Sequence, residues 1–254
     1  MTLTVAVVGA NGRMGKLVSG IIEANPAWEL VAQLGSSSPR EEMLAADVVV
    51  DVTNPAVSPE IVTFALEHGR NVLVGTSGWS ADRIDSLRAT VQQHPDSGVI
   101  IVPNFSLGSV LATRLATVAA RFFDSIEIIE AHHAAKVDSP SGTAVRTAEL
   151  MAKAREDLGP VSAPHADQLA RGQQVASIPI HSLRLQGVVA RQEVIFGGTG
   201  EVLSVAHDTL SQDAYAHGIT VAIGALRDAR GVTVGLEQLL DLDGTEQAAG
   251  AVTA

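Results

Sequence analysis

A glycine-rich turn joins the first apolar run of the chain to the first segment with helical periodicity. Residues 3–8 are a short, valine-rich run, and the turn from Gly9 to Gly15 has the spacing G-x-x-G-x-x-G. In such a turn the first glycine permits a tight bend, the second lets a pyrophosphate approach the backbone, and the third lets the helix pack on the strand. The first amides of that helix would face the phosphates. The turn therefore predicts a dinucleotide site, although a glycine-rich turn without a ligand has the same spacing.

Strand and helix patterns alternate through the first hundred residues. After the run at 3–8, short apolar or alternating runs typical of strands occur at 28–34, 48–52, 71–74 and 98–102, with helical patterns between them. This alternation favours a parallel sheet with helices on both faces. We therefore predict an α/β fold in which residues 1–105 form a Rossmann-like, dinucleotide-binding domain.

The pattern changes after Pro103. We expect a helix from Leu107, a strand at 125–131, a helix at 143–158, and mostly strands at 178–208. Long strands without helices between them favour an open mixed sheet, and so a second, α+β domain over residues 106–212. A last helix is expected at about 213–230. With it, residues 213–242 are expected to return to the first domain and form part of it. The tail 243–254, rich in Ala, Gly and Thr, is predicted to be disordered.

Composition limits the function. The chain has 28 acidic and 17 basic residues, a net charge of −11, and no cysteine. A surface this acidic repels phosphate backbones, so we expect neither nucleic acid nor a membrane as a partner. The apolar runs are far shorter than the ~20 residues that a spanning helix needs. Without cysteine there are no disulfides, thiolate zinc sites or cysteine nucleophiles, which fits a cytoplasmic location. An anionic ligand must be bound by a local pocket.

The end of the second predicted strand bears on the choice of cofactor. An acidic residue there would bind the ribose 2′-hydroxyl of NADH. Here Gly35 and three serines follow the strand, Arg40 is near, and no acid occurs before Glu41. Hydroxyls and a guanidinium can receive a 2′-phosphate, which a carboxylate would repel. We predict that NADPH is used at least as well as NADH. Alternatively, Ser38 only caps a short helix with Pro39 in its first turn and Glu41 completing a capping box.

The densest polar stretch of the chain lies at 130–143, between a predicted strand and a helix. His132, His133 and Lys136 are followed by Ser141, Gly142 and Thr143. Histidine exchanges protons near neutral pH, and lysine can hold an anion or donate a proton. The amides of residues 141–143 at a helix start form an anion site. This pattern favours a small carboxylate-bearing substrate. Two alternatives are a solvated loop with a serine cap and a metal site built from His132, His133 and Asp138.

Arg184, on a predicted strand in the second half of the chain, is a further candidate. Arginine binds carboxylates through two parallel hydrogen bonds, so this residue could hold a second carboxylate of the substrate.

Four motifs together resemble those of the 4-hydroxy-tetrahydrodipicolinate reductase (dihydrodipicolinate reductase) family. They lie at 9–15, 75–78, 102–106 and 130–144, and the resemblance continues to 231–237. The stretch His-His-x-x-Lys-x-Asp-x-Pro-Ser-Gly-Thr-Ala is the most distinctive part. The resemblance implies hydride transfer from NADH or NADPH to a small cyclic dicarboxylate, 4-hydroxy-tetrahydrodipicolinate, in the diaminopimelate route of lysine biosynthesis.

The resemblance also implies roles for individual residues. His132 is the proton donor or acceptor and Lys136 a second proton donor. The substrate is bound by His133, Ser141, Gly142, Thr143 and Arg184. The cofactor is bound by three turns, which contain Gly9, Ala10, Asn11, Gly12, Arg13 and Met14, then Gly75, Thr76 and Ser77, then Val102, Pro103, Asn104 and Phe105. No metal is implied. The family further implies a homotetramer assembled through the sheets of the second domains.

Two features depart from the family pattern. Gly35 replaces the acid that often ends the second strand, and Gly-Thr-Ser-Gly-Trp stands at 75–79 where Gly-Thr-Thr-Gly-Phe is usual. Two rival interpretations also remain. One is a non-catalytic NAD(P)-binding sensor of the same fold. The other is another two-domain NAD(P)-dependent dehydrogenase. The aspartate-semialdehyde type needs a nucleophilic cysteine, and the homoserine type does not explain paired histidines before Pro-Ser-Gly-Thr.

Overall fold

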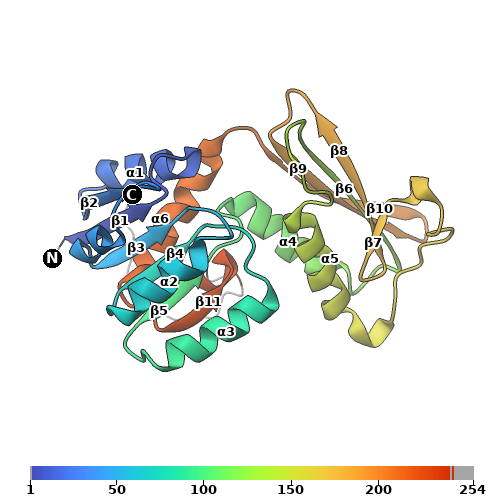
Figure 1. Cartoon of the computed structure of the whole chain (residues 1–254). Helices are drawn as coiled ribbons and strands as arrows, with labels where there is room; N and C mark the ends of the chain where they lie inside the picture. The colour runs from blue at the N-terminus through green and yellow to red at the C-terminus, as the bar shows by residue number, and fades with distance from the viewer. Residues whose placement is uncertain (1, 241, 243–254) are drawn as a thin grey trace. The chain divides into compact units, whose positions relative to one another are not determined.

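The computed structural model describes residues 2–240 and 242, and these fall into two compact units (Figure 1). Unit 1 holds the residues before Ser106 and those after Tyr215, and unit 2 is Ser106–Tyr215. The tail predicted to be disordered, 243–254, lies outside the described residues. Within those residues, no helix has both the length and the apolar character needed to cross a membrane.

Unit 1 is built on a parallel sheet with the strand order β11-β5-β4-β3-β1-β2. The strands are β1 (Leu3–Val8), β2 (Trp28–Leu34), β3 (Val48–Asp51), β4 (Asn71–Val74), β5 (Gly98–Ile101) and β11 (Gly231–Val234). All neighbouring pairs are parallel. Every residue of β3, β4 and β5 is buried, as expected for strands covered on both faces, and this burial explains their continuous apolar runs. The predicted Rossmann-like sheet is confirmed.

Helices cover both faces of this sheet. On one face, α1 (Arg13–Ala24) contacts β1 and β2, and α6 (Ala216–Leu226) contacts β4, β5 and α1. On the other, α2 (Ser58–Glu67) contacts β3 and β4, and α3 (Ala81–Gln92) contacts β11. The core beneath α2 and α3 includes Leu66 and Val91 packed with residues of the strands.

Two details of unit 1 differ from the sequence-based expectation. The edge strand β11 was not predicted, because its four residues begin with a glycine and are only half-buried, so they lack a buried-strand pattern. The expected capping role of Ser38 is wrong. Its hydroxyl accepts a hydrogen bond from the amide of Gly35 at 3.1 Å, which closes a turn. The 3₁₀ helix that follows, Arg40–Ala45, has Pro39 at its N-cap and no side-chain cap.

Unit 2 contains an open mixed sheet with the strand order β10-β9-β6-β8-β7, as predicted. Its strands are β6 (Ser125–His133), β7 (Gln173–Val175), β8 (Ile178–Leu185), β9 (Ala190–Gly198) and β10 (Glu201–Thr209). Strands β6 and β8 are parallel, and the other neighbours are antiparallel. Helices α4 (Leu107–Ala119) and α5 (Gly142–Ala154) contact each other and pack on one face, over a core that includes Ile128, Met151 and Phe196.

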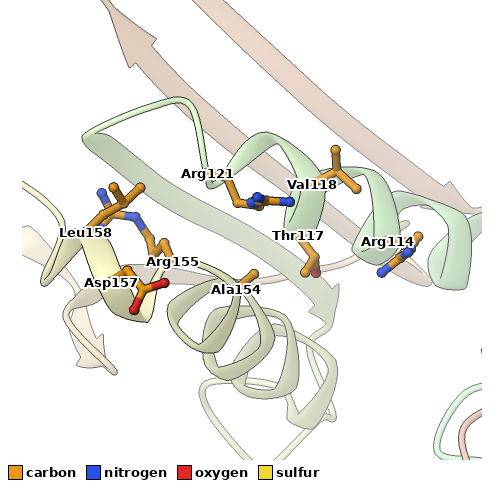
Figure 2. A pocket seen from close by; sticks show the side chains of 8 residues that line it. All are labelled: Arg114, Thr117, Val118, Arg121, Ala154, Arg155, Asp157 and Leu158. Atoms are coloured by element: carbon orange, nitrogen blue, oxygen red, sulfur yellow. The ribbon is translucent and has the colours of Figure 1, made fainter.

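A hollow beside α4 and the end of α5 contains no predicted site residue. It is lined by Arg114, Thr117, Val118, Arg121, Ala154, Arg155, Asp157 and Leu158 (Figure 2). The buried Arg155 donates to the carbonyl oxygens of Ala120 at 3.2 Å and Gly159 at 2.6 Å. Because Ala120 is the C-cap of α4, Arg155 satisfies the end of that helix. This arginine is therefore a structural residue of unit 2.

Candidate active site

The turn after β1 has the geometry of a phosphate-binding turn. Gly9 has φ +90°, and a Cβ there would lie 2.6 Å from the carbonyl oxygen of Val52. A Cβ on Gly15 would lie 2.2 Å from the carbonyl oxygen of Gly9. Gly12 is the N-cap of α1, where no side chain caps the helix and no acidic residue lies in the first turn. The first amides of α1 can therefore donate hydrogen bonds to an anion.

The fold brings the three predicted cofactor segments to one edge of the unit 1 sheet. The glycine turn follows β1, residues 75–77 follow β4, and residues 102–105 follow β5, all at the carboxyl ends of parallel strands. The strand order reverses at β1, which has β2 on one side and β3 on the other. In open α/β sheets, ligands bind at this edge, near the point of reversal.

A buried carboxyl group, which sequence analysis did not single out, anchors the turn after β4. Asp51 is fully buried and accepts hydrogen bonds from the hydroxyls of Thr53, at 2.6 Å, and Ser58. The indole Nε1 of Trp79 donates to the Ser58 hydroxyl at 3.0 Å, and the Thr76 hydroxyl donates to the carbonyl oxygen of Asp51 at 3.4 Å. Trp79 therefore makes a hydrogen bond that a phenylalanine at this position could not make.

In unit 2, a buried glutamate organises the predicted catalytic histidine. The Glu130 side chain is 0% exposed, and its Oε2 lies 2.6 Å from His132 Nδ1. Arg184 lies opposite His132 on β8 and binds both carboxylate oxygens of Glu130, at 2.9 and 3.0 Å. The amide of Ser141 donates to Glu130 Oε1 at 3.2 Å. One carboxylate thus joins strand β6, strand β8 and the start of α5.

The surroundings of Glu130 and His132 determine the charge of each side chain. Burial raises the pKa of Glu130, but hydrogen bonds from Arg184, Ser182 and His132 outweigh it, so the pKa lies below its usual range. Burial lowers the pKa of His132, and the interaction with Glu130 offsets this only in part. At neutral pH, Glu130 is therefore ionised and His132 is neutral.

The loop between β6 and α5 holds the predicted lysine against an aspartate of the same loop. Lys136 Nζ binds both carboxylate oxygens of Asp138, at 2.7 and 2.8 Å, and this hydrogen bonding lowers the pKa of Asp138. The hydroxyl of Ser141, the N-cap of α5, accepts from the amide of Ala144 at 3.3 Å. The amides of Gly142 and Thr143 belong to the same first turn, where a helix leaves its N–H groups without intrahelical partners. The turn is suited to bind an anion.

Not every predicted site residue joins this cluster. His133 is the exposed last residue of β6, and strand alternation directs its side chain to the face opposite that of His132. Glu130 was not singled out from the sequence, although its position two residues before His132 on a strand places both side chains on one face. Within residues 2–240 and 242, no group of three or more His, Cys, Asp or Glu side chains is arranged to hold a metal ion.

Unit 1 has a parallel sheet covered on both faces, with the predicted cofactor turns at one edge. Unit 2 carries a histidine paired with a buried glutamate, and a lysine. These features together identify the class of protein. It is the class of two-domain NAD(P)-dependent oxidoreductases. Residues 3–105 match the family model described as "Dihydrodipicolinate reductase, N-terminus", and residues 108–240 match "Dihydrodipicolinate reductase, C-terminus". The chain belongs to the dihydrodipicolinate reductase family, and it is an NAD(P)H-dependent oxidoreductase.

Individual relatives agree. The chain is 62% identical to a 4-hydroxy-tetrahydrodipicolinate reductase of Clavibacter sepedonicus, over 98% of this chain and 90% of the relative. It is 43% identical to the enzyme of the same name from Streptomyces griseus, over 95% and 99%. The structure of dipicolinate-bound dihydrodipicolinate reductase from Paenisporosarcina sp. TG-14 matches with a TM-score of 0.81 and 30% identity, over 94% of this chain and 100% of that one. The resemblance inferred from the motifs is confirmed. Membership of this family argues against both rival interpretations, a non-catalytic NAD(P)-binding sensor and another type of two-domain dehydrogenase.

Proposed function

We propose that the protein reduces 4-hydroxy-tetrahydrodipicolinate to tetrahydrodipicolinate with NADPH or NADH, in the cytoplasmic diaminopimelate route to lysine. Family membership supports the reaction, and the dipicolinate bound to a relative supports a cyclic dicarboxylate as the ligand. The observation that carries the proposal is the arrangement in unit 2. A neutral histidine on a buried carboxylate, a lysine and the first amides of α5 are brought together by one segment, 130–143.

We assign the binding of the cofactor to unit 1 and of the substrate to unit 2. The dihydronicotinamide supplies a hydride when it is bound. In unit 1, the first turn of α1 would hold the pyrophosphate, and residues 75–77 and 102–105 would lie beside the nicotinamide. In unit 2, the amides of Gly142 and Thr143 would hold one substrate carboxylate, with Ser141 beside it, whereas His133 points to the face of β6 opposite His132 and is not assigned to the substrate. The fit rests on the uncapped N-terminus of α1 and on the tight backbone packing of the turn, which leaves no room for a side chain at Gly9 or Gly15.

Proton transfer is assigned to His132 and Lys136. Because Glu130 occupies Nδ1 of His132, Nε2 is the nitrogen that can exchange a proton with the substrate. A doubly anionic substrate beside His132 would raise its pKa, since opposite charge favours the imidazolium. Lys136 would leave Asp138 for the substrate, because its three donors can serve a carboxylate or supply a proton.

The function is tested in a coupled assay with freshly generated substrate. We expect a substrate-dependent loss of absorbance at the nicotinamide band, with kcat/KM for NADPH at least equal to that for NADH. A preference for NADH of roughly tenfold or more, equivalent to about 1.4 kcal/mol, would contradict the cofactor prediction. Binding of NAD(P)H without turnover would contradict the proposed reaction.

A variant at the residue after β2 tests directly how the protein discriminates between NADPH and NADH. In Gly35→Asp the new carboxylate would stand where a 2′-phosphate is expected, so kcat/KM for NADPH should fall roughly tenfold or more by repulsion while the value for NADH is kept. A Cβ at Gly35 would lie 2.5 Å from Asn11 Nδ2, the end of a side chain that can rotate away. Equal losses with both cofactors would show that residue 35 does not discriminate between them.

We also propose a homotetramer that uses the face of the unit 2 sheet opposite α4 and α5. Leu183, Leu185 and Val202 are exposed there, and large apolar side chains exposed on one face favour association. Light scattering should give the mass of a tetramer, and the double variant Leu183→Glu with Val202→Glu should give a smaller species. As a control, Leu158→Glu changes another exposed leucine, one that lines the hollow in Figure 2, and should leave the mass unchanged. A monomeric wild-type protein would refute the assembly.

A further inference from the structure

We propose that Glu130 is a positioning residue, which holds His132 in the tautomer with its proton on Nδ1, and that Arg184 serves this carboxylate rather than the substrate. The inference rests on the proposed function and names a residue that the sequence-based assignment left out. The Glu130 carboxylate is completely buried, and it accepts hydrogen bonds from Arg184 and the Ser141 amide and contacts His132.

The contact between Glu130 and His132 selects the tautomer. An ionised carboxylate only accepts hydrogen bonds, so at 2.6 Å the shared proton must belong to Nδ1. The Nε2 of the neutral ring then carries a lone pair, and in the imidazolium it becomes the donor. In both states the nitrogen that changes protonation is the one turned away from Glu130. The carboxylate thereby fixes both the rotation of the ring and the atom that handles the proton.

Arg184 is committed within the protein. Its Nη1 donates to Glu130 and to the carbonyl oxygen of Leu183 at 2.7 Å. Its Nη2 donates to Glu130 and to the carbonyl oxygen of Asp138 at 2.6 Å. The remaining donor, Nε, has no hydrogen-bond partner but is buried. With all four Nη hydrogens used and Nε shielded from solvent, Arg184 has no accessible donor for a substrate carboxylate. Its contacts instead tie the Lys136 loop, through Asp138, to the carboxylate that orients His132.

The same strand carries a matched cluster on its opposite face. Glu127, three residues before Glu130, accepts hydrogen bonds from Arg171 and from His181 Nε2 at 2.7 Å. It is again a glutamate with one arginine and one histidine. Because the number of residues between Glu127 and Glu130 is even, their side chains point to opposite faces of the sheet. Glu127→Gln is therefore the matched control: it disrupts a similar glutamate–arginine–histidine cluster on the same strand, but on the face away from His132.

The central test is Glu130→Gln, which keeps the size and removes the charge. The charged groups around His132 are Glu130, Arg184 on β8, and Lys136 with Asp138 in the loop. Of these, Glu130 favours the imidazolium, so its neutralisation lowers the pKa of His132 further. The limb of kcat/KM that depends on protonated His132 should move to lower pH by about one unit or more. The kcat should fall ~10²-fold or more, because the amide can donate to Nδ1 and select the other tautomer.

Folding of each variant is checked by circular dichroism and thermal melting. Glu127→Gln should keep the pH midpoint and a kcat near that of the wild type. A folded Glu130→Gln with the wild-type kcat and pH profile would overturn the proposal. Since the wild type must turn over 4-hydroxy-tetrahydrodipicolinate for this comparison, failure of the proposed function would be seen separately, as an inactive wild type.

A measurement on the wild-type protein covers the case in which Glu130→Gln does not fold. Imidazole ¹⁵N shifts of the ligand-free protein at neutral pH distinguish the two tautomers, and His132 is assigned among the eight histidines as the signal lost in His132→Asn. We expect protonated Nδ1 and unprotonated Nε2. Protonation at Nε2 alone would refute the proposal without any reference to activity.

Arg184→Lys separates the two roles of the arginine. A positioning role predicts a lower kcat and a shifted pH profile, with KM for the substrate within roughly threefold of the wild type, because ground-state binding is untouched. A role in holding the substrate carboxylate predicts the reverse, a KM raised roughly tenfold or more with little change in kcat or its pH dependence.

Discussion

Replacing Lys136 by methionine is expected to lower kcat by ~10²–10⁴-fold, the usual contribution of one positioned proton donor. Methionine retains much of the length of the side chain and removes the ammonium group. In the wild type that group lies 2.7 Å from Asp138, in the loop between β6 and α5. The loss should be measured as steady-state kcat with saturating NADPH and freshly generated substrate.

The loss should not reflect unfolding. Asp138 is 61% exposed in its side chain, and ion pairs at such positions contribute only ~0–1 kcal/mol, so the melting temperature should change little. Lys153→Met is the matched control, because Lys153 is an exposed lysine in the last turn of α5. It should keep the wild-type kcat. Near-normal turnover by Lys136→Met would refute the role assigned to Lys136.

Replacing Gly12 by alanine is expected to raise the Kd of NADPH roughly tenfold or more while the fold survives, since a methyl group would stand where the pyrophosphate must approach the backbone. A Cβ at Gly12 would lie 3.3 Å from the carbonyl oxygen of Gly9, a contact that a small shift relieves. Fluorescence titration gives the Kd, and thermal melting of the ligand-free protein gives the stability.

Two other glycines of α1 give opposite controls. A Cβ on Gly20 would meet nothing within 4 Å, so Gly20→Ala should leave the Kd unchanged and add ~0.5–1 kcal/mol of stability through helix propensity. A Cβ on Gly15 would lie 2.2 Å from backbone, so Gly15→Ala should lower the melting temperature. If Gly12→Ala binds NADPH as tightly as Gly20→Ala does, the phosphate site at this turn is ruled out.

Much of this protein was predictable from local patterns. Strands β3, β4 and β5 are buried on both faces, which favours apolar residues at successive positions. The resulting short apolar runs can be recognised in the sequence as strands. The turn at Gly9 needs a left-handed conformation, which restricts the residue type at that position. The stretch 130–143 was also visible, because its polar residues are adjacent in the chain. Each of these signals depends on a residue and its near neighbours only.

The roles of Glu130 and Arg184 were decided by the tertiary structure. These residues are 54 positions apart, and they meet only because β6 and β8 pair in parallel with His132 opposite Arg184. From the sequence, Arg184 was as well suited to a substrate carboxylate as to one within the protein, since both offer two oxygens to a guanidinium. The edge strand β11 was likewise decided by pairing, with β5. A strand's partner and register depend on the packing of the whole sheet, and no window along the chain contains that information.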